Sequence, residues 1–159
     1  MVSLKWCCNK KEGIKLIESN HNLSKGYIQM AENAIGTMNR EKTLNNQFAI
    51  SACYYSMYYS LYSVLMKIGI KCEIHACTLE IMKKLLMEFY SKEDYKIISK
   101  AFDIRNTSQY YVDKIIAKED MEFIFSKAQS FLNKSKDVLS MINEKDILNI
   151  RKQIEIMSS

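Results

Sequence analysis

The 159-residue chain contains no proline and only four glycines, Gly13, Gly26, Gly36 and Gly69. Proline and glycine supply most of the tight turns between β-strands, so their scarcity disfavours a β-rich fold and favours long helices with short connections. We therefore expect an all-α fold. The length and the 48% content of hydrophobic residues predict one domain with an ordinary buried core.

Long apolar runs are also missing. No stretch approaches the roughly 18 to 20 residues that cross a bilayer, and residues 1–11 lack the apolar centre of a signal peptide. The sequence therefore predicts a cytoplasmic protein with no membrane partner. The net charge of +5 is mild and its lysines are spread along the chain, which permits contact with nucleic acid but does not by itself indicate it.

The cysteines form neither a CxxC pair nor an even set: they are Cys7, Cys8, Cys53, Cys72 and Cys77. This odd count predicts reduced thiols. Cys72, His75 and Cys77 lie close together in sequence, but a structural zinc site needs a further ligand pair, and the only other histidine is His21. We predict no metal site and no cofactor.

Common catalytic motifs are absent as well. The sequence has no glycine-rich phosphate loop, no Gly-x-Ser-x-Gly and no His-Glu-x-x-His. Most of the common enzyme classes are thereby disfavoured.

Tyrosine is abundant, and five of the ten tyrosines fall within residues 54–62. Tyr54, Tyr58 and Tyr62 follow the i, i+4, i+8 spacing of one helix face, and Tyr55 and Tyr59 form the adjacent stripe. Because a buried phenol still needs a hydrogen-bond partner, this run predicts a polar network within a bundle or between two bundles.

Apolar spacing and capping residues predict the remaining helices. We expect helices over about 23–40 (capped by Asn22), 47–68 (ended by Gly69), 75–90, 91–111 (starting at Ser91 and Asp94) and from 118 onward, a last short helix capped by Asn143, and one helical turn at 14–18. This predicts an antiparallel four- to five-helix up-and-down bundle over residues 22–142, preceded by a lead-in at 1–21 and followed by a short helix at 143–159.

Residues 103–111 are unusually polar for a helix and surround a single arginine, Arg105. One interpretation is a helix end, since Asn, Thr and Ser side chains compete with helical backbone bonds. In that case Arg105 would pair with Asp103 or with a glutamate in the core.

A second interpretation comes from the order of motifs. The helix Ala52-x-Tyr54-Tyr55-x-Met57-Tyr58 is followed by Gly69, by His75, and then by Arg105-Asn106-x-x-x-Tyr110-Tyr111. Over about residues 22–140 this order resembles the HEPN superfamily, in particular the small prokaryotic HEPN-like proteins associated with toxin–antitoxin systems. The resemblance implies a helical bundle that forms a homodimer, often paired with a minimal nucleotidyltransferase. Active members are metal-independent endoribonucleases.

The same resemblance implies the site residues. Arg105 and Asn106 match the family motif, but the expected histidine position, 110–112, holds Tyr110, Tyr111 and Val112. A tyrosine hydroxyl titrates near pH 10 and a histidine near 6.5, so a tyrosine is only about 0.1% ionised at pH 7, a handicap of roughly 4 kcal/mol for a base. We therefore expect weak or absent catalysis.

In the catalytic reading, Arg105 stabilises the pentacoordinate phosphate, Asn106 orients Arg105 or the RNA, and His75 or Tyr110 handles the proton. Tyr55 and Tyr111 are further candidates, with Arg105, for binding a phosphate or nucleotide. The predicted function is that of a toxin–antitoxin HEPN-like protein that binds RNA or nucleotide in a dimer cleft. The alternative is a non-catalytic module that partners a minimal nucleotidyltransferase.

Overall fold

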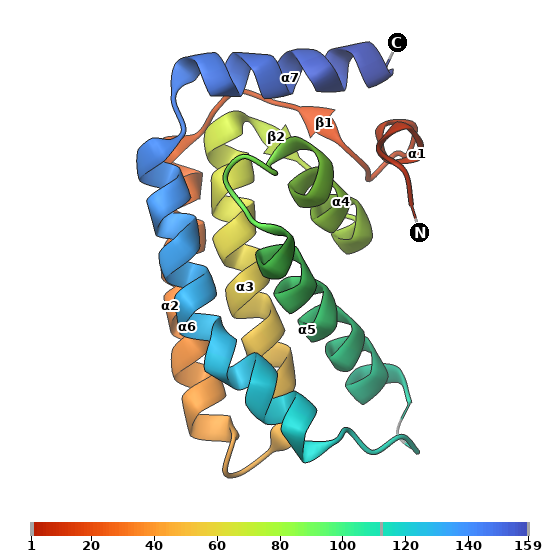
Figure 1. The fold of residues 1–159 in the computed structure, drawn as a ribbon, viewed down its shortest axis with the longest axis vertical. Coiled ribbons are helices and arrows are strands. Elements are labelled where there is room, and N and C mark those ends of the chain that lie inside the picture. The colour runs from red at the N-terminus through yellow and green to blue at the C-terminus, as the bar shows by residue number, and fades with distance from the viewer. Residues whose placement is uncertain (1, 112, 159) are drawn as a thin grey trace.

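The computed structural model of the chain describes residues 2–111 and 113–158, and helices dominate them (Figure 1). In chain order the elements are α1 (Leu4–Cys8), β1 (Lys15–Leu16), α2 (His21–Glu41), α3 (Asn46–Ile68), β2 (Ile70–Lys71), α4 (His75–Leu85), α5 (Lys92–Tyr110), α6 (Lys118–Met141) and α7 (Glu144–Ser158). The long helices α2, α3, α5 and α6 form the bundle, and α7 lies across one end of it. The predicted all-α bundle is confirmed.

Helix α3 is the centre of the bundle and packs against α2, α5 and α6. The Asn45 side chain accepts a hydrogen bond from the Phe48 amide at its start, and Gly69 ends it in the left-handed region at a φ of 83°. Most of its residues are buried, including Tyr54, which is fully inaccessible to solvent. The predicted boundaries, 47 and 68, differ from the observed ones by at most one residue.

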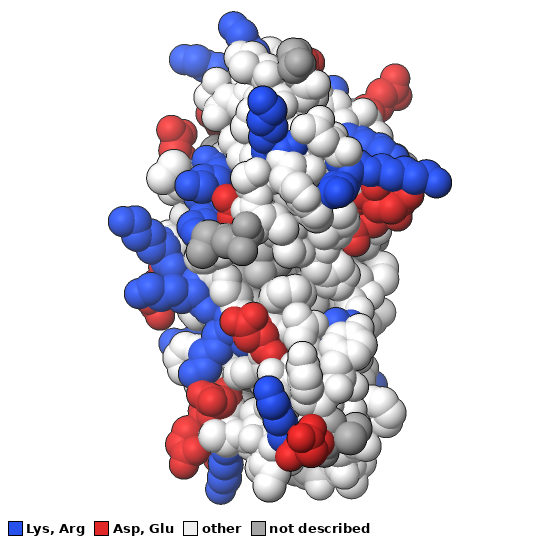
Figure 2. Space-filling model, turned by 90° about the vertical axis from the view of Figure 1, so that its right-hand side faces the viewer, with Lys and Arg blue, Asp and Glu red and all other residues white. Residues whose placement is uncertain are grey.

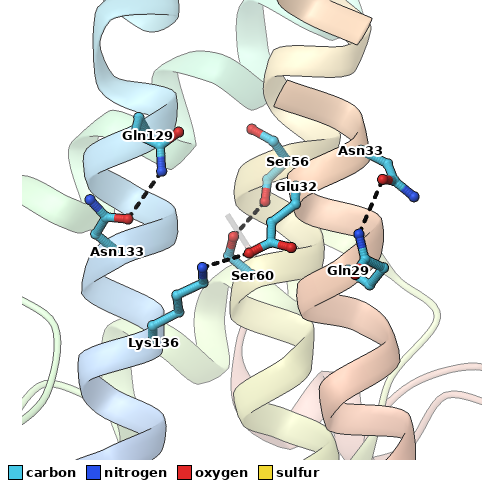
Figure 3. Close-up of polar contacts among 8 residues, drawn as sticks. All are labelled: Gln29, Glu32, Asn33, Ser56, Ser60, Gln129, Asn133 and Lys136. Carbon is cyan, nitrogen blue, oxygen red and sulfur yellow. Dashed lines mark hydrogen bonds and ion pairs between the residues drawn. The ribbon is translucent and has the colours of Figure 1, made fainter. Parts of the chain in front are cut away.

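Two buried serines of α3, Ser56 and Ser60, lie between α2 and α6 (Figure 3). The Ser56 hydroxyl donates to the Cys53 carbonyl at 2.7 Å, and the Ser60 hydroxyl donates to the Ser56 carbonyl at 2.6 Å, the second of which Figure 3 draws. Both hydroxyls are thus satisfied although buried. Beside Ser60 in this view, the Lys136 ammonium of α6 pairs with the Glu32 carboxylate of α2 at 2.6 Å. The helix cap of α2 is Asn20, two residues before the predicted Asn22.

Helix α5 begins as predicted, with a capping box in which Ser91 and Asp94 exchange side-chain and backbone hydrogen bonds. It continues through Asn106 to Tyr110. Helix α4, in contrast, ends at Leu85 and not at the predicted Tyr90. Tyr90 is instead buried against α6, where its hydroxyl donates to Ser135 at 2.8 Å.

The predicted helical turn at 14–18 is wrong. Lys15 and Leu16 form β1, paired antiparallel with Ile70 and Lys71 of β2. The Ile17 amide extends this pairing by donating to the Gly69 carbonyl at 2.9 Å. Because the partner strand is more than fifty residues away in sequence, no local pattern indicates this pairing.

The prediction that all cysteines are reduced thiols is also wrong. Cys7 of α1 and Cys77 of α4 form a disulfide, while Cys8, Cys53 and Cys72 are free. The short helix α1 was not predicted, and it places Cys7 beside the start of α4. Spacing along the chain could not show this, since the two sulfurs are separated by 70 residues.

Helix α7 lies across the end of the bundle at which α1 and β1 are also found. Asn143 and Asp146 exchange hydrogen bonds at its start, which confirms Asn143 as the predicted cap. The Arg151 guanidinium donates from Nη1 to the carbonyls of Ile17, Ile68 and Gly69 at 2.8, 3.1 and 3.0 Å. This arginine therefore connects α7 to the N-terminal segment and to the end of α3.

Across the described ranges, we find no helix with the length and apolarity that a membrane span requires.

Candidate functional site

Arg105 lies on α5 and is directed toward α3. Its Nη2 donates to the Tyr55 hydroxyl at 3.0 Å, and its Nη1 donates to the Asn106 side-chain oxygen at 3.0 Å. The Nε atom is buried and has no hydrogen-bond partner. Neutral groups thus fix the guanidinium while part of its donor capacity stays unused.

Three tyrosine rings surround this guanidinium. Its central carbon lies 5.4 Å from the ring centre of Tyr55 and 5.9 Å from those of Tyr54 and Tyr110. Such cation–π contacts are favourable but do not neutralise the charge. The cluster of Arg105, Asn106, Tyr54, Tyr55 and Tyr110, here called the Arg105 cluster, therefore keeps a net positive charge.

The interpretation in which Arg105 pairs with a carboxylate is not supported. Among the residues that the structure describes, no acidic side chain lies within ion-pair distance of Arg105, and this includes Asp103. Burial raises the pKa of the Asp103 carboxyl above its usual value. Asp103 thus takes up a proton at a higher pH than an unperturbed aspartate would.

His75 joins this cluster from the first residue of α4. Its Nδ1 lies 2.8 Å from the Tyr54 hydroxyl, and its ring stacks on Tyr58 at 4.1 Å between centres and 15° between planes. The His75 ring centre is also 6.0 Å from that of Tyr55. The structure therefore brings His75 to the tyrosines that contact Arg105.

The protonation states follow from burial and from the arginine. Burial, and secondarily the charge of Arg105, lower the pKa of His75 below 6.5, so the imidazole is neutral at pH 7. Burial strongly raises the pKa of Tyr54, which keeps the phenol protonated. Tyr54 can then donate to Nδ1, which leaves the imidazole hydrogen on Nε2. In this state the nitrogen that would act as a base is already hydrogen-bonded.

Tyr110 and Tyr111 have different surroundings. Tyr110 is 70% exposed and contributes its ring to the Arg105 cluster. Tyr111 is 51% exposed, and its ring lies against the Lys114 ammonium, 4.4 Å away. The predicted site residues Arg105, Asn106, Tyr55, Tyr110 and His75 are thus brought together, whereas no contact places Tyr111 in the cluster. Val112 lies outside the described residues.

Sequence reasoning did not assign Tyr54 and Phe102 to the site. Tyr54 links His75 to Arg105, and the Phe102 ring packs against both Tyr54 and His75 at 5.6 and 6.4 Å. Gln109, also unassigned, donates to Ser51 of α3 at 3.4 Å. The sequence did contain a signal for Phe102 and Gln109, because positions 102, 105 and 109 share one helix face through their i, i+3 and i+7 spacing.

The disulfide also bears on the metal trio considered from the sequence. Cys77 forms a disulfide with Cys7, and His75 Nδ1 is hydrogen-bonded to the Tyr54 hydroxyl. Two of the three candidate ligands therefore already have other partners. Within residues 2–111 and 113–158 no group of three or more His, Cys, Asp or Glu side chains is arranged to hold a metal ion.

Comparison with known proteins adds independent evidence. The sequence model of a family described as the HEPN domain matches residues 23–138, which covers the bundle and the whole Arg105 cluster. A protein of Methanocaldococcus jannaschii named "Putative toxin MJ0142" is 32% identical over 94 residues, which are 58% of this chain and 64% of that protein. A "UPF0332 protein" of Archaeoglobus fulgidus is 28% identical over 91 residues, 57% of this chain and 73% of that one. The match thus spans less than two thirds of the Methanocaldococcus relative.

Proposed function

The chain belongs to the HEPN domain family, and from this premise we propose that it is a toxin-like protein that binds RNA at the Arg105 cluster and cleaves it weakly without a metal ion. The proposal rests on the surroundings of the Arg105 guanidinium. A half-buried guanidinium that is fixed by neutral partners and balanced by no described carboxylate is suited to an anion such as a phosphate. The name of the Methanocaldococcus relative supports a toxin-like role.

Each residue then has a chemical role. Arg105 stabilises the additional negative charge of the pentacoordinate phosphate, and Asn106 holds the guanidinium in place through the Nη1 hydrogen bond. His75, as a neutral imidazole, donates a hydrogen bond from Nε2 to the phosphate, because Tyr54 occupies Nδ1. Tyr110, exposed beside Arg105, takes the place where the family motif would put the proton acceptor. A tyrosine there accounts for weak cleavage.

We further propose that two chains form the RNA-binding cleft. Large apolar side chains are exposed at the end of the bundle where α5 stops: Leu44, Phe48, Tyr110, Tyr111 and Ile115. Figure 2 shows that the lower right of the face it views is largely free of charged side chains. Pairing this end with a second copy would cover apolar surface and bring two Arg105 clusters together.

The test is RNA binding and cleavage by the purified chain in EDTA, with its oligomeric state measured by sedimentation in the same buffer. We expect a dimer that cleaves single-stranded RNA slowly, and loss of binding and cleavage in Arg105→Ala. Arg40→Ala, at an exposed arginine of α2, is the matched control and should behave as wild type. A monomer at tens of micromolar that neither binds nor cleaves RNA would refute the proposal.

A non-catalytic role is the second candidate, and the tyrosines at 110 and 111 favour it. In that case the same cleft holds RNA, a nucleotide or a minimal nucleotidyltransferase partner without cleaving anything. RNA binding that depends on Arg105, with no cleavage by the wild-type dimer, would select this candidate.

A further inference from the structure

A groove of about 480 Å³ lies where the C-terminal end of α4 meets the first turns of α5. Four lysines line it, Lys83, Lys84, Lys92 and Lys96, and no acidic residue is among its described lining residues. Most of its remaining surface is apolar and includes Met87 and Tyr95. The groove is thus an apolar trough with a basic rim, and Arg105 is not part of it.

The acidic residues nearest to these lysines do not line the groove. The Glu93 carboxylate lies 3.8 Å from the Lys96 ammonium, but both side chains are largely exposed, and such pairs contribute little. Asp94 is bonded to Ser91 in the capping box. Figure 2 views the molecule from the side on which α4 and α5 lie in Figure 1, and blue side chains gather there along the left edge at mid-height.

The position of Tyr95 connects the groove to the Arg105 cluster. Tyr95, Phe102 and Arg105 follow one face of α5, at i, i+7 and i+10. At 1.5 Å per residue, Tyr95 and Arg105 are about 15 Å apart along the helix axis. Phe102, between them, contacts both Tyr54 and His75. A strand of a few nucleotides spans this distance.

The geometry points to the groove as a second RNA contact, which binds the single-stranded segment flanking the phosphate held at Arg105. This inference rests on the proposed function, because it assigns the groove to the same RNA strand. Lysines that follow a backbone, together with an aromatic ring on which a base stacks, are the usual elements of single-strand binding without sequence readout. Tyr95 supplies the ring, with the Lys83 ammonium 5.1 Å from its centre, and Lys92 and Lys96 supply phosphate contacts one helical turn apart.

An acidic amphipathic peptide would also match a basic apolar groove. We favour RNA because Tyr95 lies on the same helix face as Arg105, which places the groove in line with the site for which RNA is proposed. The two occupants differ in a measurable way. RNA binding at the groove must depend on the ring of Tyr95 and on salt, and it must be coupled to the length of the strand that reaches Arg105.

The experiment measures binding of a labelled 12-nucleotide oligouridine by fluorescence anisotropy, at several KCl concentrations, to the full chain. Lys92→Ala/Lys96→Ala should weaken binding about tenfold and lower the slope of log K against log salt by about 1.4, since each phosphate contact on a single strand contributes about 0.7. The matched control, Lys25→Ala/Lys42→Ala, removes an exposed lysine of α2 and the exposed lysine that follows its last residue, and it should change affinity less than twofold.

Two substitutions at Tyr95 test the ring. Tyr95→Leu should weaken binding roughly tenfold, because a base loses its stacking surface, whereas Tyr95→Phe keeps the ring and should bind as wild type. Melting temperatures are measured for every variant. If Tyr95→Leu fails to fold, the lysine pair, whose side chains are at the surface, still decides the question.

The outcomes separate this inference from the proposed function. If Arg105→Ala loses affinity while Lys92→Ala/Lys96→Ala matches the α2 control, the groove assignment is overturned and the proposed function stands. If wild type binds no RNA, both fail. If wild type binds polyglutamate through Lys92 and Lys96 as tightly as it binds oligouridine, the groove is an acidic-peptide or general anion site and the RNA assignment is overturned.

Discussion

The prediction that most sharply separates function from architecture compares two arginines. Arg105 bonds to the neutral Tyr55 and Asn106, whereas Arg151 bonds to the backbone carbonyls of Ile17, Ile68 and Gly69. We expect Arg105→Ala to abolish RNA binding with little loss of stability, and Arg151→Ala to unfold the chain at a distinctly lower temperature. The comparison is internal, since both guanidinium groups are partly buried and each is replaced by the same residue.

The magnitudes follow from the contacts. Arg105→Ala removes two hydrogen bonds worth about 1 kcal/mol each, but it also removes a buried Nε that has no partner, a group that costs about 1 to 3 kcal/mol. The net change in the free energy of unfolding is therefore about 1 kcal/mol or less, or about 2 to 4 °C in Tm for a chain of this size. Arg151→Ala removes charge-assisted bonds to carbonyls and leaves buried acceptors unpaired, which costs about 3 kcal/mol, or about 6 to 12 °C.

Differential scanning calorimetry and RNA-binding anisotropy on the same preparations provide the test. Arg105→Lys is a useful third variant, because it keeps the charge but loses the planar fork, and we expect intermediate binding. If Arg105→Ala lowers Tm as far as Arg151→Ala does, and wild type shows no RNA binding, then Arg105 is a structural residue and its predicted phosphate contact does not exist.

Three further predictions concern the cysteines, His75 and Tyr110. A thiol assay of the denatured, unreduced chain should find three free thiols, Cys8, Cys53 and Cys72, and Cys7→Ser/Cys77→Ser should lower the free energy of unfolding by about 2 to 4 kcal/mol; five free thiols would contradict the disulfide. Because the pKa of His75 is lowered on folding, the unfolded chain binds more protons than the folded chain between that lowered pKa and about pH 6.5, so stability should fall as the pH drops through this range. His75→Gln should reduce this dependence in a plot of Tm against pH. An unchanged dependence would show that the lowered pKa of His75 is not its cause. Tyr110→His should increase RNA cleavage over wild type, since an imidazole at that exposed position is a better proton acceptor; equal or lower cleavage at unchanged RNA affinity would mean that the missing histidine does not limit the reaction.

Much of the bundle was predictable because its signals are local. The α3 boundaries follow from apolar residues and from Gly69, whose φ of 83° few other residues adopt. Ser91 and Asp94 identify the start of α5 through a capping box contained in four residues. The N-terminal segment was not predictable in this way. Its strand, its disulfide and its contact with Arg151 all involve partners more than fifty residues distant, and residue spacing carries no information about such pairings.

The site shows the same division. The interaction of Arg105 with Asn106 joins adjacent residues, so the sequence suggested it, and the family resemblance supplied the role. The direction of the guanidinium depends on Tyr55, fifty residues earlier, and only the packing of α5 against α3 reveals that contact. The engagement of His75 Nδ1 by Tyr54 was likewise hidden, although it decides whether His75 can act as a base.

The tyrosine run of α3 now has a physical explanation that combines these observations. A leucine-rich α3 would pack the bundle equally well, but it could not hold a guanidinium or an imidazole inside it. Tyr54 and Tyr55 offer ring faces to Arg105 and hydroxyls to His75 and Arg105, so one helix face satisfies both groups without any carboxylate. A carboxylate would satisfy Arg105 better and would compete with a phosphate for it. Neutral partners keep the arginine in place and leave its charge for an anion from outside the chain.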